Sequence, residues 1–178
     1  MPLVHKSRRY MLPDLLGPDL RIVFCGSAVG AASYRRRAPY AKPGNKFWPT
    51  LHAVGLTPRR FAPEDWRELL AIGVGLTDLN KTQFGNDTDL APEHDDAAGL
   101  RRKIARHRPR VLAFTAKRPA MVFLAVKKLD YGLQEARAGE TLLFVLPSPS
   151  GRAGSFWTIE PWRALARLCD ELPPLRIT

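Results

Sequence analysis

Four short apolar segments recur along the chain, and longer segments with helical spacing lie between them. Each of the four is almost continuously apolar, with Val, Leu, Ile and Phe in successive positions. Such runs are typical of strands buried on both faces of a parallel sheet, whereas half-exposed strands alternate apolar and polar residues. We therefore predict a central, mainly parallel, four-stranded sheet made of residues 21–27, 74–79, 110–115 and 141–147.

The segments between these strands carry apolar residues at three- and four-residue intervals, as helices do. Phe47, Leu51 and Val54 follow this spacing after the first strand, and a second helix is expected to begin at Pro63. The alternation of strands and helices predicts an α/β fold with three layers, α/β/α. The remaining helices are predicted within residues 92–106, 119–129 and 159–172.

Composition indicates one folded domain with a polyanionic partner. Hydrophobic residues make up 45% of the chain, enough for a substantial core. Because no repeat or linker divides the chain, we expect a single domain over residues 1–178, with its core at about residues 20–172. The 28 Lys and Arg residues exceed the 17 Asp and Glu residues, which gives a net charge of +11 at pH 7. This charge favours nucleic acid as the partner, with a membrane surface as the second choice.

Two further features indicate the cellular setting. The chain has no run of about 18 apolar residues, and Pro13 and Asp14 interrupt the apolar stretch near the N-terminus, so we expect neither a membrane span nor a signal peptide. Cys25 and Cys169 are too few for a disulfide framework, an all-cysteine zinc site or a four-cysteine iron–sulfur cluster. We expect reduced thiols in a cytoplasmic protein, associated with the nucleoid if the cell is bacterial.

The loop after the first predicted strand is rich in small residues. In open α/β sheets the functional site lies outside the carboxyl ends of the strands, so such loops are the first places to search. The stretch from Gly26 through Ser27 and Ala28 to Gly30 permits a tight turn that directs backbone N–H groups at a ligand. It lacks the Gly-Lys-Ser/Thr ending of a P-loop, and a purely structural turn would look the same.

Two further loops carry cations and hydroxyl groups. Residues 33–48 interleave basic residues, among them Lys42 and Lys46, with Tyr40, as a groove that holds phosphates and stacks a base requires. A solvated basic loop with Tyr40 packed on the core is the alternative. Residues 148–152 combine hydroxyls, glycine and arginine, although an ordinary turn has the same composition. The four histidines lack metal-ligand spacing, so we expect no metal site. We expect no cofactor either.

In their order and spacing, these segments resemble the uracil-DNA glycosylase superfamily, and most closely its mismatch-specific uracil/thymine branch. Asn45-Lys46-Phe47-Trp48 is similar to the Asn-Arg-Phe-Trp of that branch, and the Leu-Pro-Ser-Pro-Ser-Gly ending at Gly151 is similar to its Leu-Pro-Asn-Pro-Ser-Gly. The resemblance covers roughly residues 20–170. Its four segments are residues 23–30, 39–48, 75–79 and 145–151.

The chain departs from the family at two positions. Ala28 stands where the family uses Asn or Asp to position or activate the attacking water, and Ser148 stands where the superfamily has Asn or His. Either the protein has lost catalysis, or another polar residue positions or activates the attacking water. A hypoxanthine-DNA glycosylase branch also lacks a polar residue in this first motif, and the resemblance implies that it depends on an Asn matching Asn45.

The resemblance implies roles for the remaining candidates. Asn45 would orient water or read a base edge, unless it only caps the helix that follows. Asp78 would read the N–H of a base or act as a general base, unless it caps the next turn. Tyr40 would stack on the base, and the backbone N–H groups from Ser27 to Gly30 would donate to its carbonyl oxygen. DNA would be held by Lys42, Lys46 and the minor-groove turn of Ser150, Gly151 and Arg152.

The resemblance implies a monofunctional DNA glycosylase that flips uracil out of DNA and excises it, which starts base excision repair. Xanthine and hypoxanthine are further candidate bases. We expect a monomer that acts on damaged duplex DNA, with single-stranded DNA as a second substrate. The alternatives are a catalytically silent module that binds damaged DNA, and an unrelated α/β protein that binds nucleotides or phosphate through the loop from Gly26 to Gly30.

Overall fold

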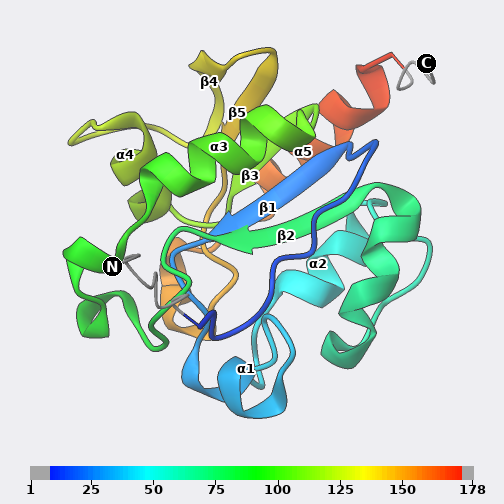
Figure 1. Cartoon of the computed structure of the whole chain (residues 1–178). Helices are drawn as coiled ribbons and strands as arrows, with labels where there is room; N and C mark the ends of the chain where they lie inside the picture. Colours follow the sequence, from blue (N-terminus) through cyan, green and yellow to red (C-terminus); the bar gives the residue numbers. More distant parts are fainter. Residues whose placement is uncertain (1–8, 174–178) are drawn as a thin grey trace.

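The computed structural model describes residues 9–173 and contains a five-stranded sheet in the order β2-β1-β3-β5-β4 (Figure 1). The four predicted strands are all present and run parallel. Nearly all their residues are buried, which explains why their sequences are apolar rather than alternating. These strands are β1 (Ile22–Gly26), β2 (Val74–Asp78), β3 (Val111–Phe114) and β5 (Thr141–Val145).

The predicted count of four strands was wrong, because β4 (Gly132–Ala138) adds a fifth at the edge of the sheet. This strand pairs antiparallel with β5, with a register irregularity between Leu133 and Arg137. All seven of its residues are exposed or half-exposed, so its sequence lacks the apolar run that marked the others. Pairing with β5, rather than an apolar sequence, makes this segment a strand.

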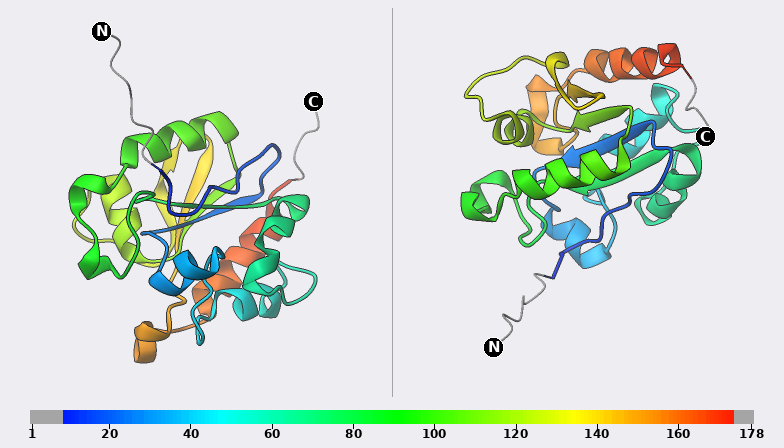
Figure 2. Two further views of the ribbon diagram at one scale, coloured as in Figure 1. Left: turned by 60° about the horizontal axis from the view of Figure 1, so that its bottom comes forward. Right: turned by 45° about the horizontal axis from the view of Figure 1, so that its top comes forward.

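Helices cover both faces of the sheet, so the described residues form the predicted three layers (Figures 1 and 2). The cluster on one face joins Phe24 to α2, α5 and the 3₁₀ helix η1. The cluster on the other face joins Val23 to α3 and α4. The helices are α1 (Ala31–Arg36), α2 (Phe47–Ala53), η1 (Pro63–Ile72), η2 (Asp87–Asp89), η3 (Pro92–His94), α3 (Ala97–His107), α4 (Lys117–Leu124), η4 (Gly151–Phe156) and α5 (Glu160–Glu171).

Two predicted helices have different bounds in the structure. The segment predicted at residues 92–106 is divided, because the side chain of Asp96 accepts a hydrogen bond from the Gly99 N–H (2.8 Å) and caps a new helix, α3. The helix predicted at residues 119–129 begins earlier and ends at Leu124, where Ala125 adopts a left-handed conformation (φ 54°). The segment after Pro63 is a 3₁₀ helix.

Residues 9–20, here called the N-terminal strap, lie along the free edge of β2 (dark blue in Figure 2). Leu15 and Leu76 exchange two backbone hydrogen bonds of 2.9 Å, and the Met11 N–H donates to the Lys81 carbonyl oxygen at 2.8 Å. The strap therefore covers an edge that would otherwise leave backbone groups unpaired, and it brings Asp14 to the carboxyl end of β2.

The cysteines and the helix lengths can be compared with the expectations drawn from composition. Cys25 and Cys169 are both buried as free thiols in the two separate core clusters. Within residues 9–173, no helix has the length and apolar character needed to cross a membrane.

Candidate active site

A cavity of about 400 Å³ opens at the carboxyl ends of the parallel strands. It gathers residues from the loops after β1, β2, β3 and β5, the end of the sheet where open α/β folds place their sites. Of the predicted site residues, only Lys46 and Gly151 do not line it. Those that do are Gly26, Ser27, Ala28, Gly30, Tyr40, Lys42, Asn45, Asp78, Ser148, Ser150 and Arg152.

The loop after β1 is fixed through its carbonyl groups. The Leu79 N–H donates to the Gly26 carbonyl oxygen (2.9 Å), and the Asn80 N–H donates to that of Ser27 (2.8 Å). Across residues 9–173, the N–H groups of Ala28 and Gly30 have no hydrogen-bond acceptor. The loop thus presents two backbone donors at the cavity wall, while the methyl group of Ala28 supplies no polar function.

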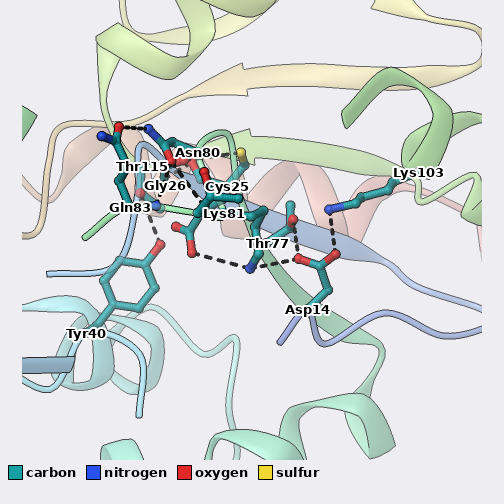
Figure 3. Close-up of polar contacts among 12 residues, drawn as sticks. Asp14, Cys25, Gly26, Tyr40, Thr77, Asn80, Lys81, Gln83, Lys103 and Thr115 are labelled. Carbon is teal, nitrogen blue, oxygen red and sulfur yellow. Dashed lines mark hydrogen bonds and ion pairs between the residues drawn. The ribbon is translucent and has the colours of Figure 1, made fainter. Parts of the chain in front are cut away.

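Three side-chain oxygens converge on the α-carbon of Gly26. A β-carbon built there would lie 2.8 Å from Asp78 Oδ1, 3.4 Å from the Tyr40 hydroxyl and 3.5 Å from Thr115 Oγ1. Only glycine leaves room for this arrangement, because real β-carbons essentially never approach an atom within 3.0 Å. The Tyr40 hydroxyl and Thr115 Oγ1 form a hydrogen bond of 3.1 Å (Figure 3).

Thr115 was missed by the sequence analysis. Its residue type gave no reason to single it out, although its place at the carboxyl end of a predicted strand was a usable signal. The structure shows that it fixes the hydroxyl of Tyr40, a residue 75 positions earlier in the chain.

Tyr40 combines the two arrangements considered for it. One face of its ring stacks on Phe47, with the centroids 3.9 Å apart and the planes 15° apart, and the residue also lines the cavity. Its backbone is left-handed (φ 52°), a conformation that is costly for tyrosine and that is held here by the surrounding contacts. Burial raises the pKa of the phenol, so the hydroxyl stays neutral.

Asn45 has a structural role as well as a place in the cavity wall. Its side-chain oxygen accepts a hydrogen bond from the Phe47 N–H (2.9 Å) and so helps to begin α2. The capping alternative is therefore present. The Asn45 amide nitrogen donates to no acceptor among the described residues, which leaves this donor available to a ligand.

Asp78 ends β2 with its side chain only 14% exposed. Burial raises the pKa of this carboxyl group to about 6, against the lowering effect of the Lys81 ammonium group, whose nitrogen lies 3.8 Å from Asp78 Oδ2. A carboxyl group with this pKa is ionised at neutral pH and can still accept a proton, which is what general-base catalysis requires. Lys81 was not predicted as a site residue, and its place beside Asp78 depends on the fold.

The loop after β5 is tied to the loop that precedes α2. The Lys46 N–H donates to the Pro149 carbonyl oxygen at 2.8 Å, which holds the two loops side by side. Within the second loop, Ser148 Oγ accepts from the Ser150 N–H and Ser150 Oγ accepts from the Arg152 N–H, both at 3.3 Å. The hydroxyl groups therefore shape the turn.

Two predicted DNA-binding residues lie away from the cavity wall. Gly151 is exposed at the start of η4, which projects from the body of the molecule (orange in Figure 2, left). The Lys46 ammonium group lies 5.4 Å from the centre of the Trp157 ring. No group of three or more His, Cys, Asp or Glu side chains within residues 9–173 could hold a metal ion.

Two comparisons with known proteins agree with this arrangement. Residues 13–166 match the family model described as the Uracil DNA glycosylase superfamily. The chain is also similar to the solution NMR structure of a proposed uracil DNA glycosylase from Methanosarcina acetivorans, at 24% sequence identity and a TM-score of 0.60. That match covers 92% of this chain and 98% of the other, and at this identity it shows a shared fold.

Proposed function

The chain belongs to the uracil DNA glycosylase superfamily, and on that premise we propose that it is a monofunctional DNA glycosylase that flips uracil out of DNA and excises it. Xanthine and hypoxanthine are further candidate substrates, and the motif residues favour the mismatch-specific branch. The observation that carries this proposal is the ionisable carboxyl group of Asp78 in a cavity built from the motif loops. We propose that it acts as a monomer.

Asp78 is the general base of the proposed reaction. Water attacks the sugar C1′ atom, the bond from C1′ to the base nitrogen breaks, and its electron pair leaves with the base. The Asp78 carboxylate accepts the proton of the attacking water, the work that Ala28 cannot perform. The pKa of about 6 keeps this group ionised at neutral pH.

The leaving base carries the developing negative charge, so donors to its carbonyl oxygens stabilise the transition state. The free N–H groups of Ala28 and Gly30 and the amide nitrogen of Asn45 provide such donors around one cavity. The Tyr40 ring stacks on the flipped base, and stacking of this kind contributes about 1–3 kcal/mol per base.

The DNA backbone lies over the mouth of the cavity in this proposal. Lys42, Ser150 and Arg152 line that region, and η4 begins at Gly151 and projects toward the minor groove. Lys46 adds charge nearby without lining the cavity. The net charge of +11 supports DNA as the partner.

A catalytically silent module that flips and binds damaged bases is the second candidate function. It is favoured by Ala28 and Ser148, which lack the polar groups of the family, and by the Asn45 carbonyl oxygen, which is already bonded within the protein. The two candidates differ only in whether the glycosidic bond is broken.

The deciding experiment is single-turnover base release from duplex and single-stranded oligonucleotides that contain uracil, xanthine or hypoxanthine. We expect wild type to release uracil, and Asp78→Asn to lower the rate of the chemical step by about 10²–10⁴ because the general base is lost. Asn45→Ala serves as the second variant, and exposed Asp130→Asn is the matched control.

The results of this experiment distinguish the possible roles of Asp78 and the two candidate functions. A changed preference among the bases, rather than a lost rate, in Asp78→Asn would mean that Asp78 reads the base. Salt-sensitive DNA binding without release of any base would reject the glycosylase and support the silent module.

A further inference from the structure

Asp14, Lys81 and Lys103 form a cluster of buried and half-buried charges on the side of the N-terminal strap (Figure 3), and Lys81 lies next to Asp78. The Lys81 side chain is 6% exposed, and its ammonium nitrogen lies 3.0 Å from Asp14 Oδ1. Asp14 Oδ2 lies 2.6 Å from the Lys103 ammonium nitrogen, and Thr77 Oγ1 donates to Asp14 Oδ1 at 2.7 Å. Asp14 is thus fully engaged, whereas Lys81 lies between two carboxylates.

The Lys81 ammonium group interacts differently with the two carboxylates. At 3.0 Å from Asp14 the ammonium group makes a charge-assisted hydrogen bond, but at 3.8 Å from Asp78 it is beyond hydrogen-bond distance. Coulombic attraction falls only in proportion to distance, so the positive charge still acts on Asp78 in this poorly solvated place. Both Asp78 oxygens remain free of the ammonium group.

We propose that Lys81 is a positioning residue for the Asp78 carboxylate, and that Asp14 holds its ammonium group close enough to act by charge but too far to occupy a carboxylate oxygen. This inference rests on the proposed function, in which Asp78 accepts the proton of the attacking water.

The positive charge of Lys81 helps to keep a buried general base ionised. A flipped base that enters the cavity removes water from around Asp78, and desolvation disfavours the charged carboxylate. Lys81 opposes this effect with its charge. A direct hydrogen bond from Lys81 would also keep Asp78 ionised, but it would occupy an oxygen and make the carboxylate a weaker base.

The backbone of the strap sets the distances. The hydrogen bonds between Leu15 and Leu76 hold the residue next to Asp14 against β2, and the Met11 N–H fixes the carbonyl group of Lys81 itself. The strap is therefore part of the site, although it precedes β1.

The charges that act on Asp78 come from Lys81, Asp14 and Lys103. The other titratable groups that face it are Cys25 on β1 and Tyr40 before α2, and burial raises the pKa of both, so they are neutral. Lys81 and Lys103 lower the pKa of Asp78, and Asp14 raises it. Removing Lys81 or Asp14 therefore has opposite effects on one carboxyl group.

The test is a ¹³C NMR titration of the Asp78 carboxyl carbon, assigned by its loss in Asp78→Asn, together with the pH profile of base release. Lys81→Met should raise the pKa of Asp78 by about one unit or more, because an opposite charge at this range is lost. Asp14→Asn should lower it, because a negative charge is lost and Lys81 becomes free to bond Asp78. At pH 7, Lys81→Met should lose about half of the rate or more, because a pKa raised from about 6 to about 7 leaves half of the Asp78 carboxyl groups protonated. Asp14→Asn should also lose rate, because a carboxylate with a lowered pKa is a weaker base.

A matched lysine variant and a folding measurement serve as controls for this test. Exposed Lys127→Met should shift neither measurement. Lys81→Met leaves Asp14 paired with Lys103, and thermal unfolding checks that each variant is folded. If Lys81→Met does not fold, Asp14→Asn alone still decides, because it must lower the pKa of Asp78 and lower the rate together.

The titration and the base-release assay distinguish failure of the positioning role from failure of the proposed function. Base release by wild type with shifts that are absent, or of the same sign in both variants, overturns the role of Lys81 and Asp14 and leaves the glycosylase standing. No base release by wild type overturns the proposed function, and with it the positioning role, whatever the titration shows.

Discussion

At the scale of single residues, the cavity carries its buried carboxyl group at the end of β2 and not in the loop after β1. Ala28 offers no water-activating group in the loop after β1. Gly26 pairs in register with Asp78 across the parallel ladder of β1 and β2, so the Asp78 side chain lies beside the glycine. Without a β-carbon at position 26, the carboxyl group, the Tyr40 hydroxyl and Thr115 share one small space.

Gly26→Ala should therefore lower base release by about 10² while the protein stays folded, because the new methyl group lies 2.8 Å from Asp78 Oδ1 and displaces the proposed general base. Single-turnover kinetics measure this loss. Gly17→Ala is the control, since its methyl group meets Leu70 at an ordinary 3.6 Å and should leave the rate unchanged. An unaltered rate in Gly26→Ala would argue against Asp78 as the base.

Asp78 should also make the protein less stable as pH rises. Its folded pKa of about 6 lies above the 3.8 that is ordinary for an aspartate, so the folded state binds more protons in that window and stability falls from about pH 4 to pH 6. Asp78→Asn removes this loss, and it should gain up to about 3 kcal/mol over wild type at pH 7.5 but little at pH 4. Denaturant unfolding at both pH values measures the difference. An equal difference at the two pH values would contradict the raised pKa.

At the scale of elements, the cavity is made by loops that hold one another. The loop after β2 fixes the carbonyl groups of the loop after β1, and the Pro149 carbonyl oxygen binds the Lys46 N–H at the start of α2. Trp162 on α5 donates through its ring N–H to the Pro147 carbonyl oxygen at 3.2 Å. The turn that begins η4 is thus anchored on two sides, while its tip, with Arg152, is exposed.

An anchored turn with an exposed cation suits insertion beside a base pair. Arg152→Ala should weaken binding to uracil-containing duplex DNA by about tenfold and weaken single-stranded binding less, because only a duplex has a gap to fill and a partner base to contact. Fluorescence anisotropy with both substrates measures this. Arg137→Ala on the exposed edge strand β4 controls for loss of one positive charge. Equal weakening on both substrates would exclude a role in the gap.

At the scale of the whole molecule, charge and architecture act together. The sheet places every motif loop at one end, and the excess of 11 positive charges gives the molecule a field that attracts a polyanion. The strap pairs with the free edge of β2 and carries Asp14 to that same end.

DNA affinity should consequently fall steeply with salt. For about six or more phosphate contacts, we expect duplex affinity of the Asp78→Asn protein to drop on the order of 10³-fold between 50 and 200 mM salt. Titrations at several salt concentrations give the slope, and free deoxyuridine monophosphate is the low-charge comparison. A flat dependence on DNA would mean that the basic surface does not contact the backbone.

The four buried strands and the order of the loops that follow them could be predicted from the amino-acid sequence alone. Continuous apolar runs report burial on both faces, and parallel strands bring their carboxyl ends to one edge, so the cavity-lining loops could be predicted locally. The sequence also supplied the family motifs, including Asn45 and Asp78. The edge strand β4 was not predicted, because its sequence has no apolar run and the segment forms a strand by pairing with β5.

The groups that surround Asp78, in contrast, could be identified only in the folded structure. Asp14 meets Thr77 across 63 positions, and Tyr40 meets Thr115 across 75, so no local pattern could show either contact. Burial, too, is a property of the assembled fold, and burial together with the Lys81 charge sets the pKa of Asp78. Residue types and their spacing specify a strand end locally, but the electrostatics of a site depend on neighbours that folding brings together from distant parts of the chain.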